Sequence, residues 1–184
     1  MHSFIEESPN YSSFKPFASF LLDNCLDECI KEYYSLLKKY NAPVLNHAEN
    51  LPEDEKKISA GDSLIRFLED IVNGQAIEST EKTVEKWKSD KLEIVNKNSI
   101  SASDILIIFS VKKQVFLNHL AGYTQSCSKM IEVIKEIEVF FLQLEQRILN
   151  SYVEIQKEII LEEKEFSESI FNNTIDGIFA WDHS

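Results

Sequence analysis

The stretch Ser126–Ile170 decides the fold; it reads SCSKMIEVIKEIEVFFLQLEQRILNSYVEIQKEIILEEKEFSESI and contains neither Gly nor Pro. A run of this length without a helix breaker predicts one continuous helix, longer than most helices of globular domains. Apolar residues recur along it in heptad-like steps of three and four, which is typical of a helix that pairs with another helix. The members of this predicted seam that we assign to a dimer and signalling interface are Phe141, Leu144, Ile148, Tyr152, Ile155, Ile159 and Phe166.

The two halves of this predicted helix differ in composition. The first half is apolar outside the seam as well, at Val133, Val139, Phe140 and Leu142, so we expect it to pack inside a domain. From Glu154 to Glu168 the residues outside the apolar stripe are mostly charged. A charged helix cannot bury such a stripe alone, so the second half predicts a parallel homodimer.

The residues upstream also predict helices. Apolar side chains recur at helical spacing over about 16–40, 52–73 and 77–95. The run ILIIFSV, which starts at Ile105, has strand propensity, but its apolar pattern continues past Lys112 to Leu120 and therefore favours a helix. With only four Gly and four Pro, the chain predicts an all-α bundle with a long C-terminal helix.

These patterns divide the chain into four parts. We expect a mobile lead-in over 1–13, a helical sensor domain over 14–150 and a signalling helix over 151–170. In the tail, Asp176-Gly177 predicts a turn and Ile178–Trp181 predicts a short strand. A single strand at that place has nothing to pair with, so we interpret 171–184 as the truncated start of a further domain.

Composition argues against several classes of function. Asp and Glu number 31 against 19 Lys and Arg, and the net charge of -12 argues against a nucleic-acid partner. The apolar runs are far shorter than the roughly 20 residues of a membrane span. The first residues lack the pattern of a secretory signal. An odd number of cysteines, three, indicates a reducing compartment, so we expect a cytoplasmic protein.

Motifs that carry catalysis or bind cofactors are missing from the sequence. It contains no GxGxxG and no GxSxG, and we expect no enzymatic activity from this chain. Cys25 and Cys29 are four residues apart but lack further ligands close by, so we interpret them as buried or idle thiols rather than a metal site. His119, after an apolar helix, is the one candidate for an axial haem ligand, and a capped or surface histidine is the alternative. We expect no bound cofactor.

The order of the segments resembles a known family. FLLDNCLDECIKEYYSLLKKYNAP, LPEDEKKISAGDSLIRFLEDIVNG, VEKWKSDKLEIVNKNSISASDILIIFSVKKQVFLNHL and LNSYVEIQKE succeed one another as in the N-terminal sensor domains of RsbR-type stressosome proteins, over about 17–158. The resemblance implies a globin-like, haem-free, dimeric input domain of a cytoplasmic signal transducer. Separately, SESIFNNTIDGIFAWD resembles the opening of a PAS domain.

Together these expectations describe an N-terminal sensory and dimerisation domain of a bacterial signal-transduction protein. Its long helix would relay a signal to a downstream PAS or kinase module, as in a sensor histidine kinase. Two alternatives stay open. One is a globin-type sensor that binds haem or a small ligand, and the other is an adaptor that docks a partner protein.

Overall fold

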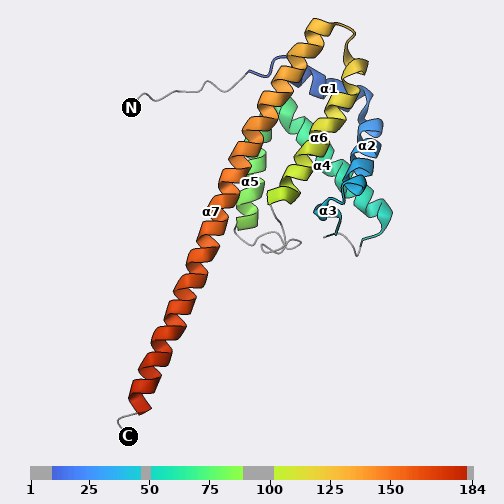
Figure 1. Ribbon diagram of the computed structural model, residues 1–184. Helices are drawn as coiled ribbons and strands as arrows, with labels where there is room; N and C mark the ends of the chain where they lie inside the picture. Colours follow the sequence, from blue (N-terminus) through green and yellow to red (C-terminus); the bar gives the residue numbers. More distant parts are fainter. Residues whose placement is uncertain (1–9, 47–50, 89–101, 182–184) are drawn as a thin grey trace, which may run out of the picture.

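A computed structural model describes residues 10–46, 51–88 and 102–181, and within these ranges every regular element is an α-helix. The all-α prediction and the long C-terminal helix are confirmed. One end of that helix lies against a bundle of the others, and the rest of it extends well beyond them (Figure 1). The helices are α1 (Phe14–Asn24), α2 (Leu26–Lys39), α3 (Pro43–Asn46), α4 (Glu53–Asn73), α5 (Ala76–Lys88), α6 (Ala102–Tyr123) and α7 (Cys127–Trp181).

The first predicted helix is in fact two helices that meet at Cys25. The backbone of Cys25 has φ -132° and ψ 13°, outside the helical range, so it ends α1 and begins α2. Just before it, the side-chain amide of Asn24 donates a hydrogen bond to the carbonyl of Phe20. Asn competes with the backbone for hydrogen bonds in this way, and Asp27 and Glu28 then suit the positive end of a new helix.

Helix α4 starts and stops where the sequence predicts. It begins after Pro52 and ends at Gly74, whose left-handed backbone (φ 73°) allows its own N–H and that of Gln75 to bond back to the last turn. Gly61 lies inside α4 and does not divide it. A Cβ at this position would lie 3.3 Å from Ile30 Cγ2, so the glycine allows α4 to approach α2 closely.

Aromatic rings from four helices fill the centre of the bundle. Phe67 of α4 lies with its ring centroid 6.0–6.3 Å from those of Phe109, Phe116, Phe140 and Phe141. Phenylalanines bury a large apolar area each and pair well at tilted or edge-to-face angles. The core therefore joins α4, α6 and the first half of α7, and α1 closes it through fully buried phenylalanines of its own.

The segment before α1 is held in place at its described end. The predicted mobile lead-in covers 1–13, of which 1–9 lie outside the described residues. Tyr11, however, is buried, its ring meets that of Phe140 edge-on at 5.3 Å, and its hydroxyl donates a hydrogen bond to Gln143. The boundary between lead-in and bundle therefore lies before Tyr11.

Helix α7 continues through Trp181, so the predicted turn at Asp176-Gly177 and the predicted strand over Ile178–Trp181 are wrong. An isolated strand would leave its backbone hydrogen-bonding groups unpaired, whereas a continuing helix satisfies them along the chain. The side chains of 172–181 are not described, and 182–184 lie outside the described residues.

Candidate functional site

The bundle-facing side of α7 supplies part of the hydrophobic core. Phe141 and Leu144 are fully buried and Ile148 is 1% exposed, all within one chain. A second copy cannot reach side chains that are already covered, so the assignment of these three residues to a dimer interface is wrong. Their heptad-like spacing reflects packing against the other helices of the same bundle.

Beyond the bundle the surroundings of α7 change. Tyr152 is partly exposed, and Phe166 is 69% exposed. The side chains of Ile155 and Ile159 lie outside the described residues. Every described side chain from Lys157 to Phe171 is exposed, and the apolar ones among them include Ile160, Leu161, Phe166 and Phe171. We call residues 157–181 the projecting segment (Figure 1).

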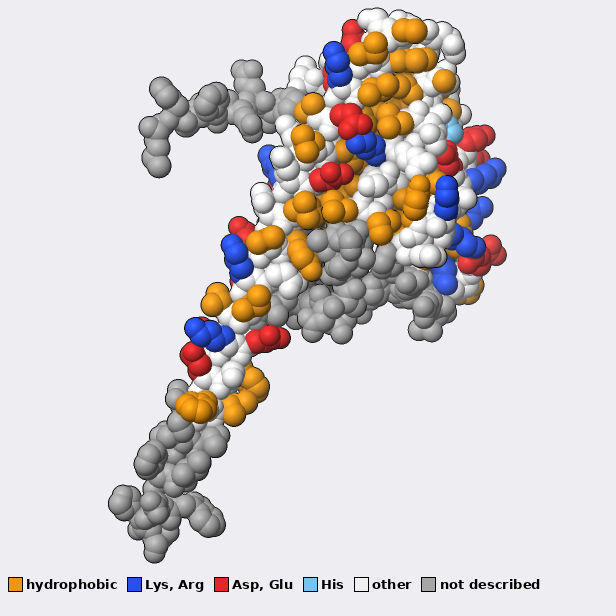
Figure 2. Space-filling view, in the orientation of Figure 1, with side chains coloured by type: hydrophobic (Ala, Val, Ile, Leu, Met, Phe, Trp, Pro, Cys, Tyr) orange, Lys and Arg blue, Asp and Glu red, His pale blue; other side chains and the backbone are white. Residues whose placement is uncertain are grey.

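The outward side of α7 is also apolar where the helix lies on the bundle. Val139 is 43% exposed and Leu142 is 55% exposed. Both residues line two grooves, one of about 1020 Å³ between α7 and α5 and one of about 220 Å³ beside Lys113 of α6. They therefore form a ridge between two hollows. Figure 2 shows hydrophobic side chains recurring along the visible face of α7 from the bundle into the projecting segment.

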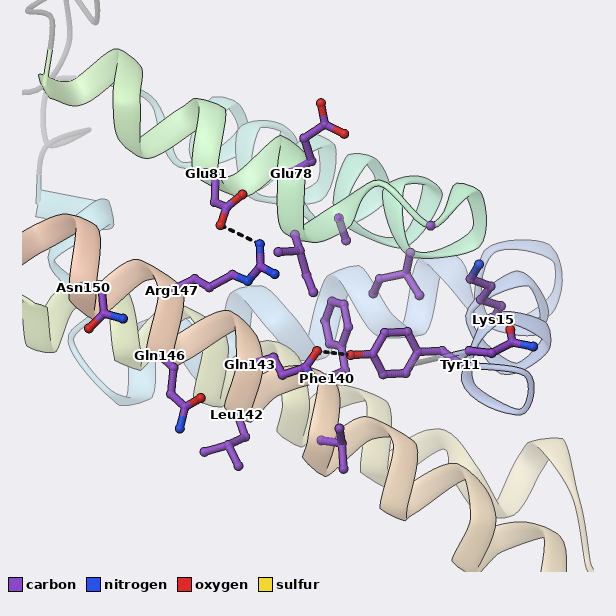
Figure 3. A pocket seen from close by; sticks show the side chains of 16 residues that line it. Tyr11, Lys15, Glu78, Glu81, Phe140, Leu142, Gln143, Gln146, Arg147 and Asn150 are labelled. Carbon is purple, nitrogen blue, oxygen red and sulfur yellow. Dashed lines mark hydrogen bonds and ion pairs between the residues drawn. The ribbon is translucent and has the colours of Figure 1, made fainter. Parts of the chain in front are cut away.

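Two pairs of polar side chains join the walls of the larger groove. In Figure 3, Tyr11 meets Gln143, and Arg147 reaches across to Glu81 of α5, with 2.9 Å between Nη1 and Oε1. These contacts fasten α5 and the segment before α1 to α7. The groove is therefore a surface cleft whose walls are joined by these side-chain contacts. The charge of Arg147 is already compensated by the carboxylate of Glu81.

The sequence candidate His119 lies near the end of α6, facing α2. Its Nε2 is buried and lies 3.1 Å from Oε2 of Glu32, although the approach angle is not that of a hydrogen bond. An axial haem ligand needs open space for iron at such a nitrogen. In this structure a carboxylate takes that place, so the surroundings of His119 do not suit haem.

Lys112 is a buried cation that the sequence patterns did not single out. It is 5% exposed, its Nζ lies 4.2 Å from the ring centroid of Phe67, and it donates a long hydrogen bond of 3.5 Å to Ser63. Burial, reinforced by the positive charge of Arg66, lowers the pKa of Lys112 to about 7, while Asp70 opposes the shift. The sequence could have indicated that Lys112 is buried, because it follows Phe109 by three residues and precedes Phe116 by four, which places it on the same side of the helix as these two phenylalanines.

The two cysteines of the first pair have different surroundings. Cys29 is fully buried, and burial, followed by the neighbouring Cys25, raises the pKa of its thiol to about 12. Such a thiol stays protonated and unreactive near neutral pH. Cys25 is partly exposed, and Cys127, at the start of α7, is exposed.

No family model, no curated protein and no solved structure matches the chain. The resemblance to RsbR-type sensor domains, the globin-like arrangement and the PAS opening remain predictions. In the part of the chain that the structure describes, no helix is both long and apolar enough to cross a membrane.

Proposed function

We propose that this chain is a sensory and dimerisation module of a cytoplasmic bacterial signal-transduction protein. In this role the bundle receives a signal, and α7 carries it to an output module such as a PAS or kinase domain. The observation that carries the proposal is the continuity of α7. One helix supplies core residues to the bundle in its first half and then extends beyond every other helix.

A relay of this kind needs a mechanical connection between the core and the projecting segment. Phe141, Leu144 and Ile148 are buried in the core. Protein interiors are close-packed, so a change in core packing should move or rotate α7 itself. A helix is stiff along its axis, and the movement then reaches the far end. The signal must favour one of two arrangements of the bundle that lie close in free energy.

No catalytic step enters this proposal. The buried thiol of Cys29 is unreactive, and His119 faces Glu32 rather than an open cavity. The haem alternative therefore loses its only ligand candidate. A docking adaptor would bind its partner through the same exposed apolar side chains of α7. Its function would not depend on the rotation of the helix about its own axis.

Insertions into α7 test the relay. The full chain is fused to an output domain that is active only in one dimeric arrangement, and residues are inserted after Glu163. A seven-residue insertion turns the downstream part of the helix by about -20° and a two-residue insertion by about 200°. We expect the first to keep the regulated output and the second to change it by roughly 5- to 150-fold.

The seven-residue insertion is the control for added length. If both insertions leave the output unchanged, α7 is only a tether, and the relay proposal is wrong. Equal loss of output from both would also contradict it, because length rather than phase would then be the cause.

A further inference from the structure

Seven residues on the outward face of α7 are spaced by alternating steps of three and four. None of them is fully buried, and the exposed fractions of Val153 and Ile160 are 48% and 61%. Steps of three and four are the spacing of core positions a and d in a coiled coil. We call this set the outer seam; its members are Val139, Leu142, Gln146, Leu149, Val153, Gln156 and Ile160.

We infer that the outer seam is the surface on which a second copy of this chain binds, with the two α7 helices parallel. The inference adds a binding surface to the proposed function. It depends on that function in one respect, namely that the chain forms a dimer. It moves the interface away from the first members of the seam that the sequence predicts, Phe141, Leu144 and Ile148, since these three face the bundle.

The position of the bundle favours the outward face. Figure 1 shows α7 as one continuous rod with the other helices gathered on one side of its first half. A second rod laid in parallel on that side would run into the bundle. On the outward side, Val139 and Leu142 are accessible beside the bundle, and Ile160 continues the same face in the projecting segment.

The charges beside the outer seam fit a parallel copy. With Val139, Gln146, Val153 and Ile160 at the a positions, each g residue of one helix meets the e residue five places later in the other. This places Glu138 against Gln143 of the second copy, Glu145 against Asn150 and Tyr152 against Lys157.

None of these three pairs brings like charges together, although the chain has 31 acidic and 19 basic residues. Each pair offers instead a carboxylate to an amide or a cation to an aromatic ring. Glu138 in addition pairs with Lys113 of its own chain, so its charge is already compensated. Electrostatic repulsion therefore does not oppose a parallel pair at these positions.

The two glutamines of the outer seam provide a reason for a fixed register. Gln146 is exposed and Gln156 partly buried in the single chain. A polar residue at a core position costs stability but aligns with its equivalent in the partner, where the two side chains can bond to each other. A shift by one heptad would set Gln146 against Val153 and leave its amide without a partner.

Cysteine cross-linking of the full chain tests the inference. The background is Cys127→Ser, which removes the exposed natural thiol. We expect Leu142→Cys and Ile160→Cys each to form a disulfide with the same residue of the second copy under mild oxidation, in most of the protein. Glu165→Cys, on the opposite side of the helix, and the unmodified background should form little.

Other patterns overturn the inference. Cross-linking at only one of the two outer-seam positions indicates an antiparallel pair, and preferential cross-linking of Glu165→Cys places the contact on another face of α7. A chain that sediments as a dimer without outer-seam disulfides refutes the seam but leaves the proposed function standing. Cross-links at both positions, together with insertions that do not affect output, support the seam and refute the relay.

Discussion

Lys112 shows how one residue can set the pH response of the bundle. The ring of Phe67 at 4.2 Å offers its ammonium group a cation–π contact, but Ser63 is only a distant hydrogen-bond acceptor at 3.5 Å. The ring of Tyr33, 5.9 Å away, is the other aromatic face nearby. These contacts replace hydration incompletely, so a charged Lys112 opposes folding.

The sign of the pH dependence is set by the pKa of Lys112. In the folded chain it is about 7, below the usual 10.5, so the unfolded chain binds more protons between these values. The free energy of unfolding should therefore rise with pH between about 7 and 10.5. We expect Lys112→Met to stabilise the protein by about 1–4 kcal/mol at pH 6, with the difference shrinking by pH 9.5.

Urea unfolding of wild type and Lys112→Met across this pH range measures the effect. Lys113→Met is the matched control, because Lys113 is the neighbouring lysine, remains partly exposed and pairs with Glu138. Its effect gives the baseline for replacing a lysine by methionine in this part of α6. A constant difference between Lys112→Met and wild type would mean that Lys112 does not titrate in the core.

At the scale of elements, a carboxylate of α7 completes the start of α1. Both oxygens of Glu136 face this helix end, and Oε2 accepts hydrogen bonds of 2.8 Å from the backbone N–H groups of Ser13 and Phe14. Ser13 occupies the cap position, but its side chain makes no capping hydrogen bond. The cap comes from a residue more than 120 positions away.

We expect Glu136→Ala to lower the free energy of unfolding by about 1–2 kcal/mol, because two N–H groups lose a charged acceptor at a helix N-terminus. Glu132→Ala, at an exposed position one turn earlier in α7, is the matched control and should change stability by less than about 0.5 kcal/mol. Chemical denaturation measures both. Equal effects of the two substitutions would show that the contact from Glu136 does not stabilise α1.

What the sequence could predict of these elements depends on how local each signal is. The end of α4 at Gly74 was predictable, because a glycine ends a helix through its own backbone. The long α7 was predictable from the lack of Gly and Pro. The break at Cys25 and the cap from Glu136 were not, since no strong local breaker marks the first and the second depends on tertiary packing.

The candidate interface was predictable only in part. Heptad-like spacing along α7 is readable from the sequence, but two faces of this helix carry it. Leu144 and Leu142 are both apolar, yet one is fully buried and the other is 55% exposed. Which face meets the bundle depends on how α4, α5 and α6 pack around it, and that is settled only in three dimensions.

At the scale of the whole molecule, the two ends of α7 are stabilised by different contacts. Up to Ile148 the helix has the bundle core behind it, whereas the described side chains of the projecting segment are all exposed. Exposed helices are marginal in water unless tertiary contacts support them. If the outer seam binds a second copy as proposed, that contact stabilises the projecting segment, whereas the bundle-packed half does not depend on it.

Amide hydrogen exchange measured at several protein concentrations tests this division. Amides from Ile137 to Ile148 should open only with global unfolding at every concentration. Those from Lys157 to Phe171 should exchange rapidly when the protein is dilute and slow down as dimers form, because each added contact along the outer seam holds the helix closed. Ile160→Asp should abolish that slowing while leaving the bundle amides protected. Protection of the projecting segment that is independent of concentration would mean that α7 is a stable helix without a partner, and the dimer would then have to form elsewhere.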